Sequence, residues 1–190
     1  MVIKFCVILF LILIGLSTNA QKFEYGIRTS FIKIDIDQYS TGAQLFPENF
    51  SDGFEIGGLV SFKPSKTLFL FQSGITFTHQ KYEYYDLNYG SVPVNLDIEI
   101  GKKAGVFLGP GFRLWYLLKV PENPYKYDYN RFLYSWNARL GVFFTVKNLK
   151  FQFYPQLEFV KTPVYTTGSW RGGTVEYELI MTSYNLTIQL

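Results

Sequence analysis

The residues that could take part in catalysis gather around His79, which is the only histidine of the chain. Asp86 and Ser91 follow it closely in the sequence. A histidine beside a serine or an aspartate can act as a general base in acyl transfer or hydrolysis. No motif links these three residues, and a histidine at a strand end is more often simply solvated. We therefore expect no catalytic residue.

Composition excludes several other classes of site. The 190 residues include 18 Lys and Arg, 15 Asp and Glu, one His and one Cys, and 48% are hydrophobic. The hydrophobic content excludes disorder, and the single Cys excludes a disulfide scaffold and, with the single His, a His/Cys metal site. A net charge of +3 that is dispersed along the chain gives no reason to expect nucleic acid as a partner. We expect neither a metal nor a cofactor.

The first twenty residues have the pattern of an export signal. A short positive start ends at Lys4, an apolar run covers residues 5–16, and small residues precede a cleavage site between Ala20 and Gln21. The alternative is a membrane anchor, but about twelve apolar residues fall short of the roughly 20 that a spanning helix needs. We expect residues 1–20 to be a cleaved signal peptide and residues 21–190 to form one domain. Cys6 lies in the signal, so the mature chain has no Cys.

The rest of the chain alternates between apolar and polar residues with a period of two, which predicts β-strands. Eight segments of about ten residues, the length of a tilted strand across a bilayer, show this pattern. They cover residues 22–31, 54–63, 69–78, 92–100, 106–116, 132–144, 151–159 and 180–190. After Phe31 the apolar positions move to Ile32, Ile34 and Ile36, which predicts a β-bulge near Phe31 or a rim extension.

The connections alternate between short and long. Short turns are expected at 64–67, 102–104 and 147–148, and longer polar stretches at 37–52, 80–91, 119–130 and 161–175. Closing the short turns as hairpins places apolar residues opposite one another on one face, as one continuous sheet requires. The predicted pairs are Phe62 with Phe69, Val60 with Phe71, Ile100 with Val106, Ile98 with Leu108, Val146 with Leu149, Phe144 with Phe151 and Val142 with Phe153.

The polar face decides how such a sheet closes. It holds mostly Gly, Ser, Thr, Asn and Gln, with few charges of both signs, which suits a crowded lumen better than a surface in water. The apolar face carries aromatic residues near both strand ends, a pattern typical of sheets that span a bilayer. The sequence therefore predicts an all-β fold, an eight-stranded antiparallel up-and-down transmembrane β-barrel with short periplasmic turns and longer extracellular loops. A soluble lipocalin-like periplasmic barrel, with the faces reversed, is the less favoured alternative.

The stretch from Ser91 to Leu118, SVPVNLDIEIGKKAGVFLGPGFRLWYLL, resembles the fourth-strand, turn and fifth-strand core of the PorT-like outer-membrane β-barrel family. The family pattern is an apolar strand that contains a Pro, a short basic turn and an apolar strand rich in Gly. With the signal peptide and the eight segments, the resemblance covers essentially all of residues 21–190. It implies an integral barrel in the outer membrane of a Gram-negative cell. One named member of the family is implicated in protein secretion.

The leading functional hypothesis is a non-enzymatic outer-membrane barrel that acts through extracellular loops or as part of a surface or secretion assembly. The alternatives are a lipid-modifying enzyme with a rim site near His79 and the lipocalin-like barrel. The expected partners are outer-membrane lipid, the barrel insertion machinery and surface or secretion-complex proteins; we expect no nucleic acid, and a monomer. Tyrosines of two predicted loops either form a recognition surface or pack at the lipid headgroups. They are Tyr82, Tyr84, Tyr85, Tyr89, Tyr125, Tyr127 and Tyr129.

Two expectations concern the lumen. An eight-stranded barrel is just wide enough for inward side chains to fill it, so we expect no general porin activity. Closing the hairpin at 147–148 sets Arg139 opposite Gln156 and diagonal to Glu158 on the inward face. This register predicts an Arg139–Glu158 ion pair, with Arg113 close enough to share the carboxylates.

Overall fold

The structure, a computed structural model, describes residues 22–37, 52–64, 67–81, 86–119, 128–161, 165–168, 174–176 and 178–190. The predicted signal peptide lies outside these residues. The strands are β1 Lys22–Asp37, β2 Gly53–Lys63, β3 Phe69–Lys81, β4 Asp86–Gly101, β5 Ala104–Lys119, β6 Asp128–Tyr129, β7 Phe132–Val146, β8 Leu149–Val160, β9 Tyr165–Gly168, β10 Thr174–Glu176 and β11 Glu178–Gln189. In the part of the chain that is described, no helix is long and apolar enough to cross a membrane.

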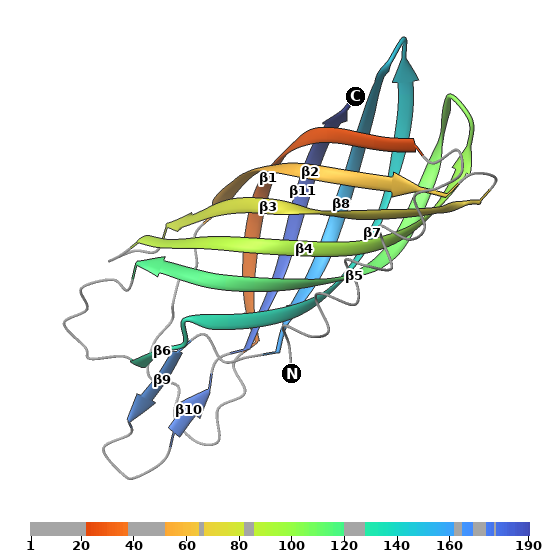
Figure 1. The fold of residues 1–190 in the computed structure, drawn as a ribbon. Coiled ribbons are helices and arrows are strands. Elements are labelled where there is room, and N and C mark those ends of the chain that lie inside the picture. Colours follow the sequence, from red (N-terminus) through yellow and green to blue (C-terminus); the bar gives the residue numbers. More distant parts are fainter. Residues whose placement is uncertain are drawn as a thin grey trace, which may run out of the picture.

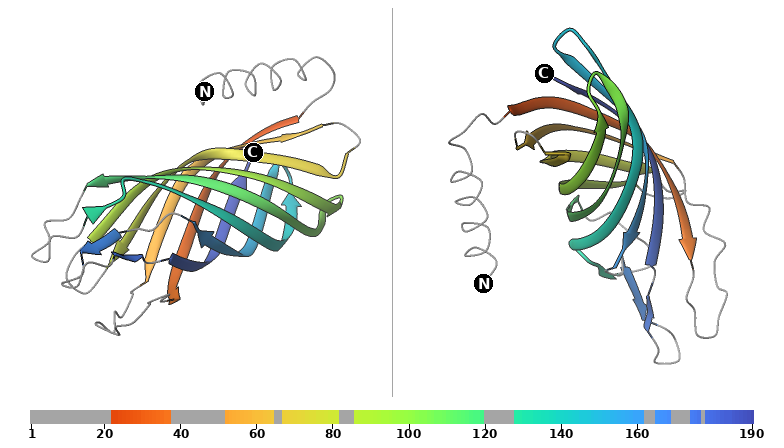
Figure 2. Two further views of the ribbon diagram at one scale, coloured as in Figure 1. Left: turned by 90° about the horizontal axis from the view of Figure 1, so that it is seen from below. Right: turned by 90° about the vertical axis from the view of Figure 1, so that its right-hand side faces the viewer.

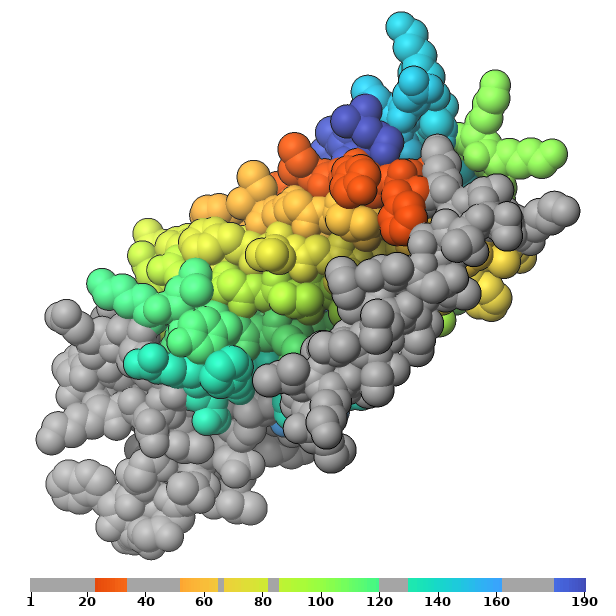
Figure 3. Space-filling view, in the orientation of Figure 1, coloured from red at the N-terminus to blue at the C-terminus, as the bar shows by residue number. Residues whose placement is uncertain are grey.

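Eight of the strands close into an antiparallel barrel, as the sequence predicts. The order around the wall is β1-β11-β8-β7-β5-β4-β3-β2, so the first and last strands of the chain pair and close the wall (Figure 1). Two further views show the same wall (Figure 2), and in the space-filling view neighbouring strands form adjacent bands of side chains (Figure 3). Closure leaves no free sheet edge along the paired part of the barrel.

Successive side chains point alternately into the lumen and away from it, as expected for β-strands. In the middle of β7, for example, Asn137, Arg139 and Gly141 are buried, whereas Ala138 and Leu140 are exposed. The same alternation holds along the other barrel strands, with the polar residues inside. The predicted assignment of the two faces is therefore confirmed.

Two of the three short hairpins have the predicted register. In the β7–β8 hairpin Val146 pairs with Leu149 and Phe144 with Phe151, and in the β4–β5 hairpin Ile100 pairs with Val106. The turns bend sharply, with Lys147 at φ 56° and Gly101 at φ 134°. The φ of Gly101 lies in a region that L side chains rarely adopt, so a glycine is needed there.

The predicted register of the β2–β3 hairpin is wrong by two residues. Phe62 pairs with Phe71 instead of Phe69. The Leu68 carbonyl accepts the Glu99 amide at 2.8 Å, so the β3 side of the connection stays bonded to β4 up to Leu68. The connection between Phe62 and Phe71 is therefore two residues longer than the predicted turn at 64–67 requires. A shift of two residues leaves every side chain on its predicted face.

The predicted bulge near Phe31 is also wrong. Phe31 pairs with Tyr184 and Ile32 with Ser183 without a shift in register. Phe31 is exposed on the outer face, whereas Ile32 points inward and is 3% exposed. The apolar pattern changes at this point because the lumen itself becomes apolar here. The alternative of a rim extension fits better, because β1 continues to Asp37 beside β11, past the end of its pairing with β2 at Gly53.

The second long polar stretch of the sequence, residues 80–91, is mostly strand. Pairing of β3 with β4 extends to Lys81 and Asp86, which leaves only residues 82–85 outside the described chain there. Tyr89, predicted to lie in a loop, is buried with its ring 5.8 Å from that of Trp115. A small sheet of β10, β9 and β6, which the sequence does not predict, lies at the barrel end away from the C-terminus (Figure 1).

The corrected β2–β3 register can be tested by disulfide trapping in a Cys6→Ser background, which removes the native Cys. Directly opposite residues lie about 4.5–5.5 Å apart at Cα, within disulfide range. Phe62→Cys/Phe71→Cys is expected to oxidise readily in folded protein, and Phe62→Cys/Phe69→Cys is not. Mass spectrometry of peptides digested without reduction measures both. Preferential closure of the second pair would contradict the observed register.

Candidate functional site

The most specific feature of the described chain is the set of charged side chains that point into the lumen, most of which are buried. They form three groups along the barrel axis. The loop-side cluster is Arg28, Glu55, Arg113 and Glu158. The middle pair is Arg139 and Asp97. The turn-side cluster is Glu24, Lys63, Glu99 and Lys150.

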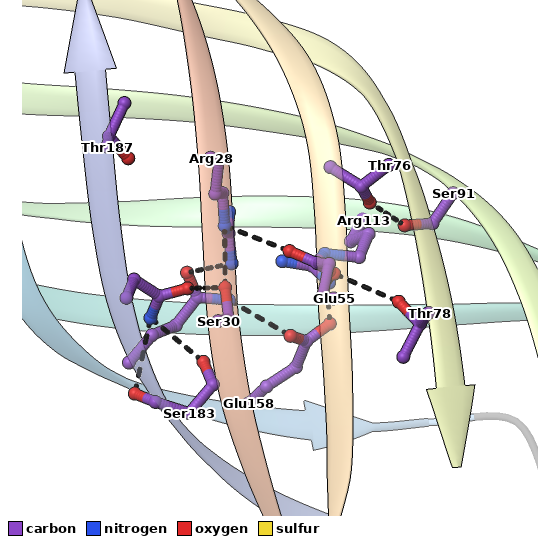
Figure 4. Close-up of polar contacts among 12 residues, drawn as sticks. Arg28, Ser30, Glu55, Thr76, Thr78, Ser91, Arg113, Glu158, Ser183 and Thr187 are labelled. Carbon is purple, nitrogen blue, oxygen red and sulfur yellow. Dashed lines mark hydrogen bonds and ion pairs between the residues drawn. The ribbon is translucent and has the colours of Figure 1, made fainter.

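The loop-side cluster is centred on Glu55, which β2 presents to the lumen with no exposed surface. Its carboxylate lies between two arginines, with Arg28 Nε 2.9 Å from Oε1 and Arg113 Nη1 bonded to Oε2 (Figure 4). The Thr78 hydroxyl donates a further hydrogen bond at 3.0 Å. Such charge-assisted bonds offset the desolvation of the ions only because each charge has a partner.

Glu158 is the second carboxylate of this cluster, held by several donors from neighbouring strands. Trp115 Nε1 donates to Oε1 at 3.1 Å, Gln156 Nε2 donates to Oε2 at 3.0 Å and the Ser135 hydroxyl also donates. Arg113 Nε lies 3.6 Å from Oε1. Arg113 therefore shares the two carboxylates of the cluster, which the sequence analysis anticipated for this residue.

The middle pair is bidentate. Arg139 Nε donates to Asp97 Oδ1 at 2.8 Å and Nη2 donates to Oδ2, the parallel geometry that makes arginine–carboxylate pairs strong. Nη1 donates to Gln72 Oε1 at 2.8 Å. The guanidinium also lies 5.2 Å from the ring centroid of Tyr154. The partners of the Arg139 guanidinium, which are Asp97, Gln72 and Tyr154, therefore all lie within the lumen.

The predicted Arg139–Glu158 pair is not formed, although the register behind it is correct. Arg139 does lie opposite Gln156. On its other side, however, Arg139 pairs with Gly109, where an added Cβ would lie only 2.5 Å from Asp97 Oδ1. The missing side chain lets Arg139 reach over β5 to Asp97 on β4. In a narrow barrel, inward side chains meet across intervening strands as easily as along the sheet.

The turn-side cluster completes the balance of charge. Lys63 Nζ lies 2.8 Å from Glu99 Oε2. Lys150 Nζ forms an ion pair with Glu99 Oε1 and also lies 3.8 Å from Glu24 Oε2. Together the three groups contain as many acids as bases. The described lumen therefore carries no net charge that would attract or select a charged solute.

Apolar side chains close the lumen on its loop side. We call this set the apolar cap; each member is an inward residue with at most 5% exposed surface. Its members are Ile32, Leu87, Tyr89, Trp115, Leu117, Leu133, Val160 and Met181. Deeper in the lumen, the rings of Phe107 and Tyr154 meet edge to face at 5.4 Å. In the described part of the chain, these side chains fill the interior of the barrel.

The catalytic candidates of the sequence are not brought together. His79 Nδ1 lies 2.9 Å from Asn88 Oδ1, and its ring lies 5.3 Å from that of Phe54, which is half exposed on the outer face. Ser91 points into the lumen, where its hydroxyl bonds Thr76. Asp86 is exposed at the start of β4. Across the described ranges, no group of His, Cys, Asp and Glu side chains could hold a metal ion.

Of the tyrosines predicted to lie in loops, Tyr82, Tyr84, Tyr85, Tyr125 and Tyr127 fall outside the described residues. The inward aromatic residues Phe107, Phe143 and Tyr154 form one buried cluster that was not predicted from the sequence. Strict alternation along each strand could have identified them, because each of the three occupies a position on the inward-facing, mostly polar side of its strand.

Comparison with known proteins identifies solved structures with a similar fold. No protein-family model and no curated protein matches the sequence. Neisserial surface protein A (NspA) has a similar structure, with a TM-score of 0.57 and 11% identity over 90% of this chain and 100% of that chain. The outer membrane protein AlkL in lipid bilayers follows at TM-score 0.49 and 9% identity over 92% of this chain and 93% of its own. Ail, the attachment invasion locus protein of Yersinia pestis, has TM-score 0.46 and 13% identity over 89% and 99%. The likeness to NspA shows that this chain has the fold of a small eight-stranded barrel.

The middle pair gives a stability prediction. Asp97→Ala is expected to lower the free energy of unfolding by about 3–5 kcal/mol, because it strands a buried guanidinium. Asp97→Ala/Arg139→Met should recover part of that loss. Asp86→Ala, at an exposed position of the same strand, should change it by less than about 0.5 kcal/mol. Urea unfolding followed by tryptophan fluorescence measures all three, and equal effects of the two single variants would refute the role of the pair.

Proposed function

We propose that this chain is an integral outer-membrane protein of the PorT-like kind, a sealed and non-enzymatic barrel that acts through its extracellular loops or within a surface or secretion assembly. The observation that carries the proposal is the reversal of the usual burial pattern. Charged and amide side chains fill the inside, whereas large apolar side chains cover the outside.

The outer surface supports a position in a bilayer. Ile27, Ile75 and Leu140, on three different strands, are between 60% and 73% exposed. Contiguous apolar surface of this kind is rare on proteins in water, where it drives association. In the hydrocarbon core of a bilayer, exposed apolar surface costs no free energy. The closed hydrogen-bond ladder of the barrel also satisfies the backbone N–H and C=O groups there. A lipocalin-like barrel would need an apolar interior and a charged exterior, the opposite arrangement.

The two ends of the barrel support an orientation. At one end are the tight β4–β5 and β7–β8 turns, together with Lys22 and Leu190. At the other end lie the longer connections and the small sheet of β6, β9 and β10. In bacterial outer-membrane barrels short turns face the periplasm and long loops face outward. We assign the ends of this barrel in the same way.

A structural role fits the described residues better than catalysis does. His79, Asp86 and Ser91 are directed to different partners and surfaces, and the lumenal carboxylates are each engaged by cations. What remains available to act is the loop end of the barrel. The resemblance of residues 91–118 to PorT-like barrels, one member of which is implicated in secretion, favours a role in a surface or secretion assembly.

Arginine scanning of the outer face tests the membrane position. Leu140→Arg, at an exposed position in the middle of β7, is expected to lower the free energy of unfolding in lipid vesicles by about 2–4 kcal/mol. Val146→Arg, at the turn end of the same strand, should cost about 0–1 kcal/mol. A soluble barrel would instead tolerate both changes alike. Denaturant titration in vesicles distinguishes these outcomes.

The packed lumen predicts no general porin activity. Purified protein in planar bilayers is expected to show no stable, large single-channel conductance, because the ion clusters and the apolar cap occupy the interior. The recording should be repeated with protein whose folding has been checked by circular dichroism. Reproducible large openings from folded protein would show that the lumen is open.

A further inference from the structure

The lipid-facing side of the barrel carries an apolar groove of about 410 Å³ near its loop end. It crosses β3, β4, β5 and β7. Side chains that line it include Ile75, Val92, Leu114, Tyr116, Phe132 and Tyr134, with Gly90 between them. We call this hollow the outer groove.

A single glycine opens the outer groove. Gly90 on β4 pairs with Phe77 on one side and Tyr116 on the other, so a position without a side chain separates two aromatic residues. A Cβ added at Gly90 would meet only Leu118 Cδ2, at an ordinary contact distance of 3.6 Å. Backbone packing therefore does not require a glycine at this position. Filling it with a larger side chain would remove part of the groove without straining the strand.

Two exposed cations lie at the loop end of the same groove. Lys119 pairs with Asn88, two residues along β4 from Gly90. The Lys161 amide donates to the carbonyl of Tyr134, a groove residue, at 3.0 Å. Both side chains are exposed, whereas the groove below them is apolar.

We propose that the outer groove binds one acyl chain of a phosphorylated outer-leaflet lipid, whose headgroup phosphate contacts Lys119 and Lys161. The inference rests on the proposed membrane position of the barrel. A hollow in a lipid-facing wall fills with a lipid tail, because a void would forfeit van der Waals contacts. The cations then select among lipids, since lysine binds phosphate oxygens and attracts anionic headgroups. Apolar groove and basic rim together match an amphipathic, phosphorylated ligand.

Native mass spectrometry of the purified protein in detergent tests this proposal. The probes are diphosphoryl lipid A and the same acylated sugar without phosphates. Wild-type protein is expected to retain the phosphorylated lipid in preference to the other. Each of Lys119→Ala and Lys161→Ala should weaken that retention about fivefold. Gly90→Leu should weaken retention of both lipids, because it occupies the space of the acyl chain.

Ala138→Leu is the matched control, because Ala138 is an exposed small residue on the outer face of β7 whose paired residues, Pro110 and Leu157, do not line the groove. It should bind both lipids like the wild type. Equal retention of the two lipids by wild-type protein, or equal effects of Gly90→Leu and Ala138→Leu, would overturn the lipid site. Those results would leave the membrane position intact, because folding into vesicles is measured separately. Failure to enter vesicles would instead contradict the proposed function.

Discussion

A charge placed inside a narrow β-barrel must find a partner there, and the rest of this structure depends on that constraint. Eight strands enclose too little space for bulk water to screen an arginine. The bidentate Arg139–Asp97 pair and the Glu55 carboxylate held between Arg28 and Arg113 meet the constraint with complementary ions. Arg28 and Glu55 lie on adjacent strands, whereas the Arg139–Asp97 and Arg113–Glu55 pairs reach across one and two intervening strands. The pairs therefore add to the backbone ladder that closes the wall, and their side chains occupy the lumen.

The filling of the lumen supports the proposal that this barrel acts through its outer surfaces. The apolar cap closes the loop side of the interior, and the described charges are neutralised by one another. In the proposed membrane position the outer wall contacts lipid, and the proposed lipid site combines the outer groove with its two exposed lysines. The loop end, where strands extend beyond the paired wall and a small extra sheet forms, is the part available for recognition.

Period-two alternation was sufficient to predict the eight strands, the face of each side chain and the closure of the wall. It could not predict partners that meet across the lumen, because these depend on strand tilt and on small residues such as Gly109 that let a long side chain pass. The change of pattern at Ile32 was misread as a bulge because the prediction assumed a polar lumen throughout. In fact, inward Ile32, Leu133 and Met181 belong to the apolar cap. No outward-facing pattern in the sequence marks the outer groove, which arises from the absence of a side chain at Gly90.

Spin-label accessibility along β7 tests most directly whether the wall faces lipid outside and a packed core inside. Single cysteines replace consecutive residues 136–142 in a Cys6→Ser background, and the labelled protein is placed in vesicles. Outward positions such as Ala138 and Leu140 should be accessible to oxygen, which partitions into lipid, and not to a water-soluble nickel chelate. Inward positions such as Asn137 should be accessible to neither. High accessibility to the nickel chelate at outward positions would contradict the membrane position, and at inward positions it would contradict the sealed lumen.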